Sequence, residues 1–203
     1  TPMTLIISPL KKLLSGDKES KFQKTYLMMH RNSERILSLI NQLMDIRKID
    51  KGQMQLKFQE IEIVGFIRDL CTIFDEQIEA KKMTLQFRPQ LEKLDVWVDP
   101  KNFDKIILNV LANAIKFTPE GGKIDIGLST GVDKSSQNGS QNYFEISISD
   151  TGSGIEESEL ENIFECFFQT ETSRSSNNGG TGIGLHLSRS IAQLHHGTIK
   201  AEN

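Results

Sequence analysis

The sequence has 203 residues, of which 37% are apolar and 25% charged, and its formal net charge is -3. This length accommodates one large domain or two small ones, and the near-even charge balance argues against nucleic acid or a membrane surface as a direct partner. No apolar run approaches the ~20 residues that span a bilayer. The two cysteines, Cys71 and Cys166, lie far apart, which favours a reduced, cytoplasmic compartment.

The first 50 residues carry apolar side chains at alternating three- and four-residue steps, the near-heptad spacing of packed helices. This pattern predicts a short helix, a polar turn at 15–17 and a long second helix over 18–49. Because the two helices cannot bury their apolar stripe alone, we expect a second copy to pair with them as a four-helix bundle. A hairpin packed on the rest of the chain is the alternative.

After Gly52 the pattern changes, and Met54, Leu56 and Phe58 alternate with polar residues as in a strand. The sequence then predicts a helix over 64–81, strands over 83–88 and 96–98, a helix over 100–116, strands over 123–129 and 143–149, helices over 157–164 and 183–194, and a strand from 198. No βαβ rhythm repeats, so the predicted fold class is α+β, with a helical hairpin at 1–51 and an α/β sandwich at 52–203.

The helix predicted over 100–116 carries Asn109 and Asn113 four residues apart, so both amides project from one face, and Lys116 follows almost one turn later. Neutral oxygen donors suit Mg²⁺, which binds through few protein ligands together with phosphate oxygens. A nearby lysine can neutralise phosphate charge. Polar surface residues without a function are the alternative for such a pair.

A first glycine segment follows the strand that ends at Asp150, with Gly152 and Gly154 next to it. An ionised carboxylate accepts hydrogen bonds from an exocyclic amine such as that of adenine. Glycine lets the backbone approach a flat ring closely, because it has no Cβ. Ordinary turn chemistry is the alternative for this segment.

A second glycine segment, with Gly180, Gly182 and Gly184, opens a helix whose N-terminal N–H groups can face an anion. The stretch 169–178 before it is polar enough for a mobile lid. Three phenylalanines lie between the two glycine segments, and ordinary core packing is the alternative to a functional role for them: Phe164, Phe167 and Phe168.

In this order, the asparagine pair, Asp-x-Gly-x-Gly, the phenylalanine cluster and Gly-x-Gly-x-Gly resemble the ATP-binding domain of sensor histidine kinases, in the superfamily shared with DNA gyrase and the MutL proteins. The resemblance implies an α/β sandwich that binds ATP and Mg²⁺. It assigns Asn113 to the metal, Asn109, Asn113 and Lys116 to catalysis near the phosphates, and Asp150 to adenine. The other nucleotide-binding residues that it implies are Gly152, Gly154, Ile155, Phe168, Gly180, Thr181, Gly182, Ile183, Gly184 and Leu185.

Residues 1–51 resemble the dimerisation and phosphoacceptor hairpin of the same kinases, whose first helix carries His-Glu/Asp-x-x-Thr/Asn-Pro. Thr1 and Pro2 match the end of that motif, so the acceptor histidine is expected four positions before Thr1, and Thr1 takes a catalytic role. The resemblance implies a homodimer through 1–50 and a response-regulator receiver domain as the phosphate acceptor. His30 lacks an acidic neighbour and is not expected to accept phosphate.

Some positions depart from the kinase pattern: Cys166 and Gln169 stand where many relatives carry basic residues, and the usual final strand is missing after Asn203. The sequence also resembles hybrid two-component sensors of Bacteroides-type bacteria, which implies that this chain is the cytoplasmic portion of a membrane-anchored sensor.

Two alternative functions are a clamp ATPase of the gyrase or MutL type and a non-catalytic dimerisation module. The long hairpin argues against the first, and the intact nucleotide motifs argue against the second.

Overall fold

The computed structural model describes residues 6–8, 10–11, 13, 23–133, 141–170 and 180–203. The chain divides into two compact units, Thr1–Met54 and Gln55–Asn203. The helix α2 (Gln23–Asp50) dominates the first unit, and residues 6–8, 10, 11 and 13 before it are helical as well. Along α2 an apolar stripe remains exposed within this single chain, with heptad spacing: Met29, Ile36, Ile40 and Leu43. The long second helix of the sequence analysis is therefore confirmed from Gln23 onward.

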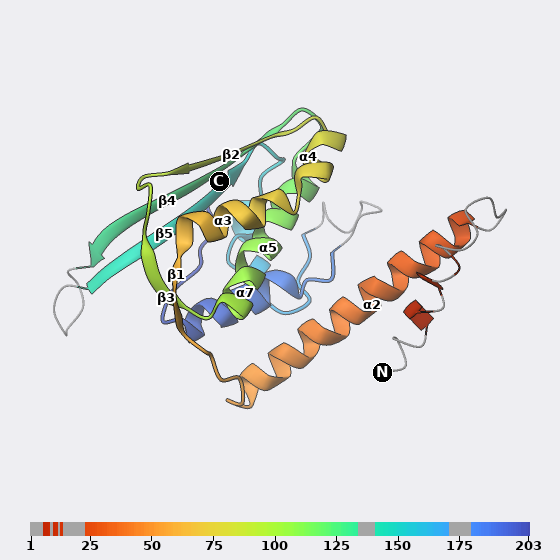
Figure 1. Ribbon diagram of the computed structural model, residues 1–203, viewed down its shortest axis with the longest axis horizontal. Coiled ribbons are helices and arrows are strands. Elements are labelled where there is room, and N and C mark those ends of the chain that lie inside the picture. Colours follow the sequence, from red (N-terminus) through yellow and green to blue (C-terminus); the bar gives the residue numbers. More distant parts are fainter. Residues whose placement is uncertain (1–5, 9, 12, 14–22, 134–140, 171–179) are drawn as a thin grey trace. The chain divides into compact units, whose positions relative to one another are not determined.

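The second unit contains two sheets and a layer of helices (Figure 1). Strands β1 (Gln59–Glu62) and β3 (Asp95–Val98) form an antiparallel pair. In the larger sheet, β4 (Lys123–Asp133) lies between a parallel β2 (Thr84–Pro89) and an antiparallel β5 (Gln141–Asp150). The remaining elements are the helices α3 (Ile63–Thr72), α4 (Asp75–Ala80), α5 (Pro100–Phe117) and α7 (Gly184–Leu194) and the 3-10 turns η1 (Glu157–Glu159) and η2 (Asn162–Phe164).

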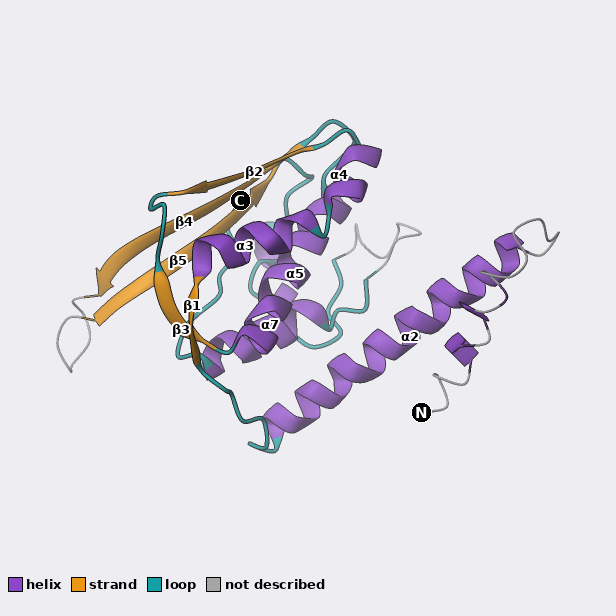
Figure 2. Ribbon diagram, viewed as in Figure 1, coloured by secondary structure: helices purple, strands orange, loops and turns teal. Residues whose placement is uncertain are grey.

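Helices α3, α5 and α7 cover one face of the larger sheet (Figure 2). The inward residues of β4 alternate with more exposed ones, as a half-buried strand requires, and Ile124, Ile126 and Leu128 are buried. The buried stripes of the helices supply the other half of the core: Ile63, Ile67, Leu111, Leu187 and Ile191. The unit is thus the mixed α/β sandwich that the sequence predicts.

Four predicted elements differ from the structure. Residues 53–58 form no strand, because the Lys57 N–H donates to the side chain of Asp99 at 2.7 Å instead of to a neighbouring strand. The predicted helix 64–81 is two helices, since the chain turns at Phe74 and buries that ring. The predicted helix 157–164 is the pair of 3-10 turns, and no strand is assigned among the described residues 195–203.

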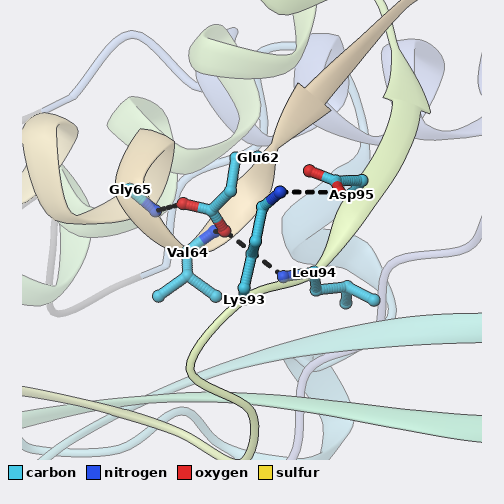
Figure 3. A network of polar contacts seen from close by, with 6 residues as sticks. All are labelled: Glu62, Val64, Gly65, Lys93, Leu94 and Asp95. Atoms are coloured by element: carbon cyan, nitrogen blue, oxygen red, sulfur yellow. Dashed lines mark hydrogen bonds and ion pairs between the residues drawn. The ribbon is translucent and has the colours of Figure 1, made fainter.

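The start of α3 is held by a carboxylate (Figure 3). Glu62 accepts from the N–H groups of Val64 at 2.9 Å, Gly65 at 2.7 Å and Leu94 at 3.3 Å. Desolvation raises the pKa of the Glu62 carboxyl, but these hydrogen bonds and the nearby Lys93 lower it to a net value below its ordinary range. One side chain therefore caps α3 and connects it to Leu94, the residue before β3.

The start of α5 is held in the same way by Asp99, which is 4% exposed. Its carboxylate accepts from the Asn102 N–H at 3.2 Å and from the Lys57 N–H at 2.7 Å. The Asp99 N–H donates to His195 Nε2 at 3.0 Å, so the His195 proton lies on Nδ1, 2.9 Å from the Ile191 carbonyl. Burial raises the pKa of the Asp99 carboxyl, but the hydrogen bonds together lower this pKa by a larger amount. The net pKa therefore lies below its ordinary value.

We expect Asp99→Asn to lower the free energy of unfolding by about 1–2 kcal/mol at neutral pH, because an amide replaces a charged acceptor. A carboxyl with a lowered folded pKa stabilises the protein above its unfolded pKa, and that stabilisation is lost as the pH falls through the folded pKa. The difference between wild type and variant in urea unfolding should therefore shrink as the pH falls below about 4, the ordinary pKa of an aspartate.

Asp95→Asn serves as the control for this experiment, because Asp95 forms only a surface ion pair with Lys93, at 3.1 Å. Its effect should stay below about 0.5 kcal/mol at every pH. A difference for Asp99→Asn that persists unchanged at acidic pH would contradict the role assigned to its charge.

Candidate functional site

The helix α5 brings the predicted asparagines and lysine to one place. Asp99 and Pro100 begin the helix, and its apolar side is buried at Ile107, Leu111 and Ile115. This leaves a half-buried face that carries the three polar residues predicted for the site, Asn109, Asn113 and Lys116. The spacing in the sequence therefore corresponds to one face of a real helix.

Asn109 connects α5 to the beginning of α7. Its Nδ2 donates to the Gly184 carbonyl at 3.1 Å and to Ser188 Oγ at 3.3 Å. Ser188 is fully buried, and its hydroxyl donates to the Gly184 carbonyl at 3.0 Å. Because the amide nitrogen is used in this way, Oδ1 is left as the acceptor atom of Asn109. Sequence reasoning missed Ser188, since a serine inside an amphipathic helix gives no signal of its partner on another helix.

Asp150 ends β5 and holds the first glycine segment by its own side chain. Its Oδ1 accepts from the Gly152 N–H at 2.8 Å, which leaves Oδ2 as a second acceptor on an exposed carboxylate. A Cβ built on Gly152 would lie 2.5 Å from Asp150 Oδ1 and 2.9 Å from the Phe117 carbonyl. Only glycine fits between Asp150 and the end of α5. Further along, the side-chain amide of Asn203 bonds to both the N–H and the carbonyl of Ile155, at 3.0 and 2.5 Å.

The second glycine segment packs against the phenylalanine cluster. The Phe167 N–H donates to the Gly182 carbonyl at 2.9 Å, and a Cβ on Gly182 would lie 2.5 Å from the Phe167 backbone. Gly182 has φ +68, which glycine adopts without strain. The alternative of ordinary core packing holds for Phe164, which is buried, but is wrong for Phe167, which is 60% exposed and has a φ of 67.

The end of α5 lies between the two glycine segments. Lys116 Nζ stands 4.5 Å from the centre of the Phe117 ring, and a Cβ on Gly180 would lie 3.3 Å from the same Nζ. The Gly180 carbonyl accepts from Gln169 Nε2 at 2.9 Å. The predicted residues thus gather around one region that offers an ammonium group, amide oxygens and a carboxylate.

The remaining predicted positions have different surroundings. Ile183 is buried in the core at 5% exposure, whereas Thr181, Leu185 and Phe168 are half-buried. Thr1 and most of the predicted lid, 171–178, lie outside the described residues. The donor set on α5 fits Mg²⁺ in kind, because Asn113 can offer a neutral oxygen one turn from a lysine. Among the described residues, no three His, Cys, Asp or Glu side chains cluster as metal ligands, and no helix has the length and apolar character needed to cross a bilayer.

Comparison with protein families gives a match over residues 98–203 to the model described as "Histidine kinase-, DNA gyrase B-, and HSP90-like ATPase". One curated relative, "Histidine kinase P4" of Formosa agariphila, is 33% identical over 204 residues. These cover 98% of this chain and 14% of the relative. The chain therefore spans a small part of the length of that protein.

Two solved structures share the fold. ShkA full-length in complex with AMPPNP matches with a TM-score of 0.80 at 21% identity, covering 100% of this chain and 40% of the other. Histidine kinase ThkA in complex with response regulator protein TrrA matches with a TM-score of 0.62 at 22% identity, covering 100% of this chain and 54% of the other. At these identities the likeness concerns the fold.

Proposed function

The chain belongs to the histidine kinase-, DNA gyrase B- and HSP90-like ATPase family and carries the ATP-binding domain of a sensor histidine kinase, and on this basis we propose that it binds Mg²⁺-ATP around the end of α5. One observation carries the proposal. The Asn109 amide joins α5 to Gly184, while Lys116 on the same helix lies beside Gly180, so the asparagine helix and the second glycine segment form one site.

In this proposal each polar group has a separate task. The free oxygen of Asp150 accepts from the exocyclic amine of adenine, and the Gly152–Gly154 backbone lies along the ring. Asn113 holds the metal ion, which when bound neutralises phosphate charge. Lys116 and the N–H groups at the start of α7 face the phosphates, and Asn109 presents its oxygen toward the same side.

We further propose that the parent protein transfers the γ-phosphoryl group to a histidine four positions before Thr1, and from there to an aspartate of a receiver domain. The ATP domain supplies no nucleophile in this reaction, and phosphoryl transfer depends mainly on positioning and charge neutralisation. The complex of ThkA with the response regulator TrrA supports a receiver as the partner. The relatives are named histidine kinases, which favours this function over a clamp ATPase or a non-catalytic module.

The same proposal includes a homodimer formed by residues 1–50. The exposed stripe Met29, Ile36, Ile40 and Leu43 supports it, because an apolar heptad stripe of this kind is buried when a second pair of helices packs on it. We also propose that the parent is a sensor anchored in a membrane, with this chain on its cytoplasmic side. The resemblance to Bacteroides-type hybrid sensors stays a prediction.

Radiolabelled ATP tests the phosphotransfer. This chain should bind Mg²⁺-ATP but take up no label, whereas a version extended upstream by about ten residues should gain an acid-labile label, because transfer requires the acceptor within reach. Replacing the upstream histidine by glutamine in the extended version is the control and should remove the label. Label on the short chain that disappears in His30→Gln would overturn the assignment of the acceptor.

A further inference from the structure

Lys81, which follows α4, reaches across the fold to the end of α5. Its Nζ donates to the Ile115 carbonyl at 2.6 Å and to the Thr118 carbonyl at 3.3 Å, with a longer contact of 3.5 Å to the Lys116 carbonyl. The partners are 34 to 37 residues away in the sequence, and the lysine is half-buried. A lysine with this set of partners is fixed in place, unlike a surface lysine.

These carbonyls are the ones that a helix end leaves without partners. Within the last turn, the Thr118 N–H and hydroxyl both donate to the Ala114 carbonyl, at 3.0 and 2.6 Å. The next carbonyl, that of Ile115, receives the Lys81 ammonium instead of an N–H. A cation is also favoured there by the negative end of the helix dipole. Lys81 therefore contacts the last turn of α5 at the carbonyls that its own backbone leaves open.

That turn is the part of α5 that faces both glycine segments. It carries Lys116, whose Nζ lies near Gly180, and Phe117, whose carbonyl is in close contact with Gly152. A small rotation of the turn would move the ammonium group of Lys116 and the carbonyl beside Gly152 together. The two groups belong to the phosphate side and the adenine side of the proposed site.

We propose that Lys81 is a positioning residue of the nucleotide site, which acts through the last turn of α5 and does not touch the nucleotide. The inference rests on the proposed function of that site. It adds a residue that no motif contains, and it explains why a lysine between α4 and β2 is directed to helix carbonyls. The neighbouring Lys82 is 79% exposed and makes only a surface ion pair with Glu120 at 2.9 Å, so it provides a matched control.

The test is calorimetric titration of the full chain with AMPPNP and Mg²⁺, at a temperature where circular dichroism shows each variant to be folded. Lys81→Met keeps the length of the side chain and removes the donor. We expect about tenfold weaker binding, because the nucleotide must then order the last turn of α5, at a cost comparable to one hydrogen bond of a charged group. Lys81→Arg keeps donors and should stay within about threefold of wild type. Lys82→Met should bind as wild type does.

Equal affinity of Lys81→Met and wild type, with only a lower melting temperature, would show a purely structural role and overturn the inference. A loss of equal size in Lys82→Met would do the same, because it would point to the general charge of the region. If Lys81→Met does not fold, Lys81→Ala replaces it, which also removes the donor, and unchanged affinity would count against the inference. Absence of binding by the wild type would overturn the proposed function itself, and the inference with it.

Discussion

Asp150→Asn should weaken the binding of Mg²⁺-AMPPNP by about 1.5–3 kcal/mol, or roughly 10- to 150-fold, the range for losing a hydrogen bond to a charged group. In the structure Asp150 Oδ1 already accepts from the Gly152 N–H at 2.8 Å, so Oδ2 is the atom left for the adenine amine. An asparagine has one carbonyl oxygen. When this oxygen keeps the bond to Gly152, the NH₂ group faces the amine of the base, and two donors meet.

Asp125→Asn makes the same chemical change on the adjacent strand, where Asp125 is opposite Ser149 and forms an exposed ion pair with Arg88. Its affinity for the nucleotide should equal that of the wild type. Titration calorimetry distinguishes the two variants directly. Wild-type affinity in Asp150→Asn would remove Asp150 from the proposed adenine pocket.

Ile40→Asp should convert the proposed homodimer to monomers, because the aspartate would be an unpaired charge in the centre of the proposed apolar seam. Within one chain Ile40 is 46% exposed, so the substitution should leave α2 itself intact. We expect the free energy of dimerisation to become less favourable by about 3–5 kcal/mol. The dissociation constant of the dimer should therefore rise more than about a hundredfold. Light scattering over a dilution series measures this change, and nucleotide binding by Gln55–Asn203 should persist.

Asn41→Asp is the matched control, since it introduces the same charge at an exposed polar position one residue further along α2. The next residue of a helix points about 100° away, so Asn41 leaves the seam unaltered. A dimer that survives Ile40→Asp would place the interface elsewhere. Loss of both dimer and nucleotide binding would show that the two units depend on each other for folding.

Patterns that depend on near neighbours were predictable from the sequence. The four-residue spacing of Asn109 and Asn113 requires only a helix, and Asp99-Pro100 marks where that helix begins. Strand β4 alternates buried and more exposed residues, and this alternation predicts a strand over 123–129. The strand begins at Lys123 as predicted but extends to Asp133. The proximity of Lys116 to Gly180 is implied by the family resemblance, whereas the periodicity of the sequence does not predict it.

The contacts that complete the site were beyond prediction, because they join residues distant in the sequence. The bonds of Asn109 to Ser188, of Lys81 to Ile115 and of Asp99 to His195 span 79, 34 and 96 residues. Each partner is a common residue with an unremarkable local pattern. The strand predicted over 54–58 failed for the same reason, since the Lys57 N–H is taken by Asp99.

The bond between the Asp99 N–H and His195 has a mechanical consequence. It fastens the first turn of α5 to the end of α7, while Asn109 fastens the middle of α5 to the start of α7 at Gly184. An antiparallel helix pair fastened at two separated points resists both splaying and sliding, because either movement breaks a partly buried hydrogen bond. The α5–α7 pair is therefore rigid. We expect the glycine segments beside it, and not the two helices, to move when a nucleotide binds.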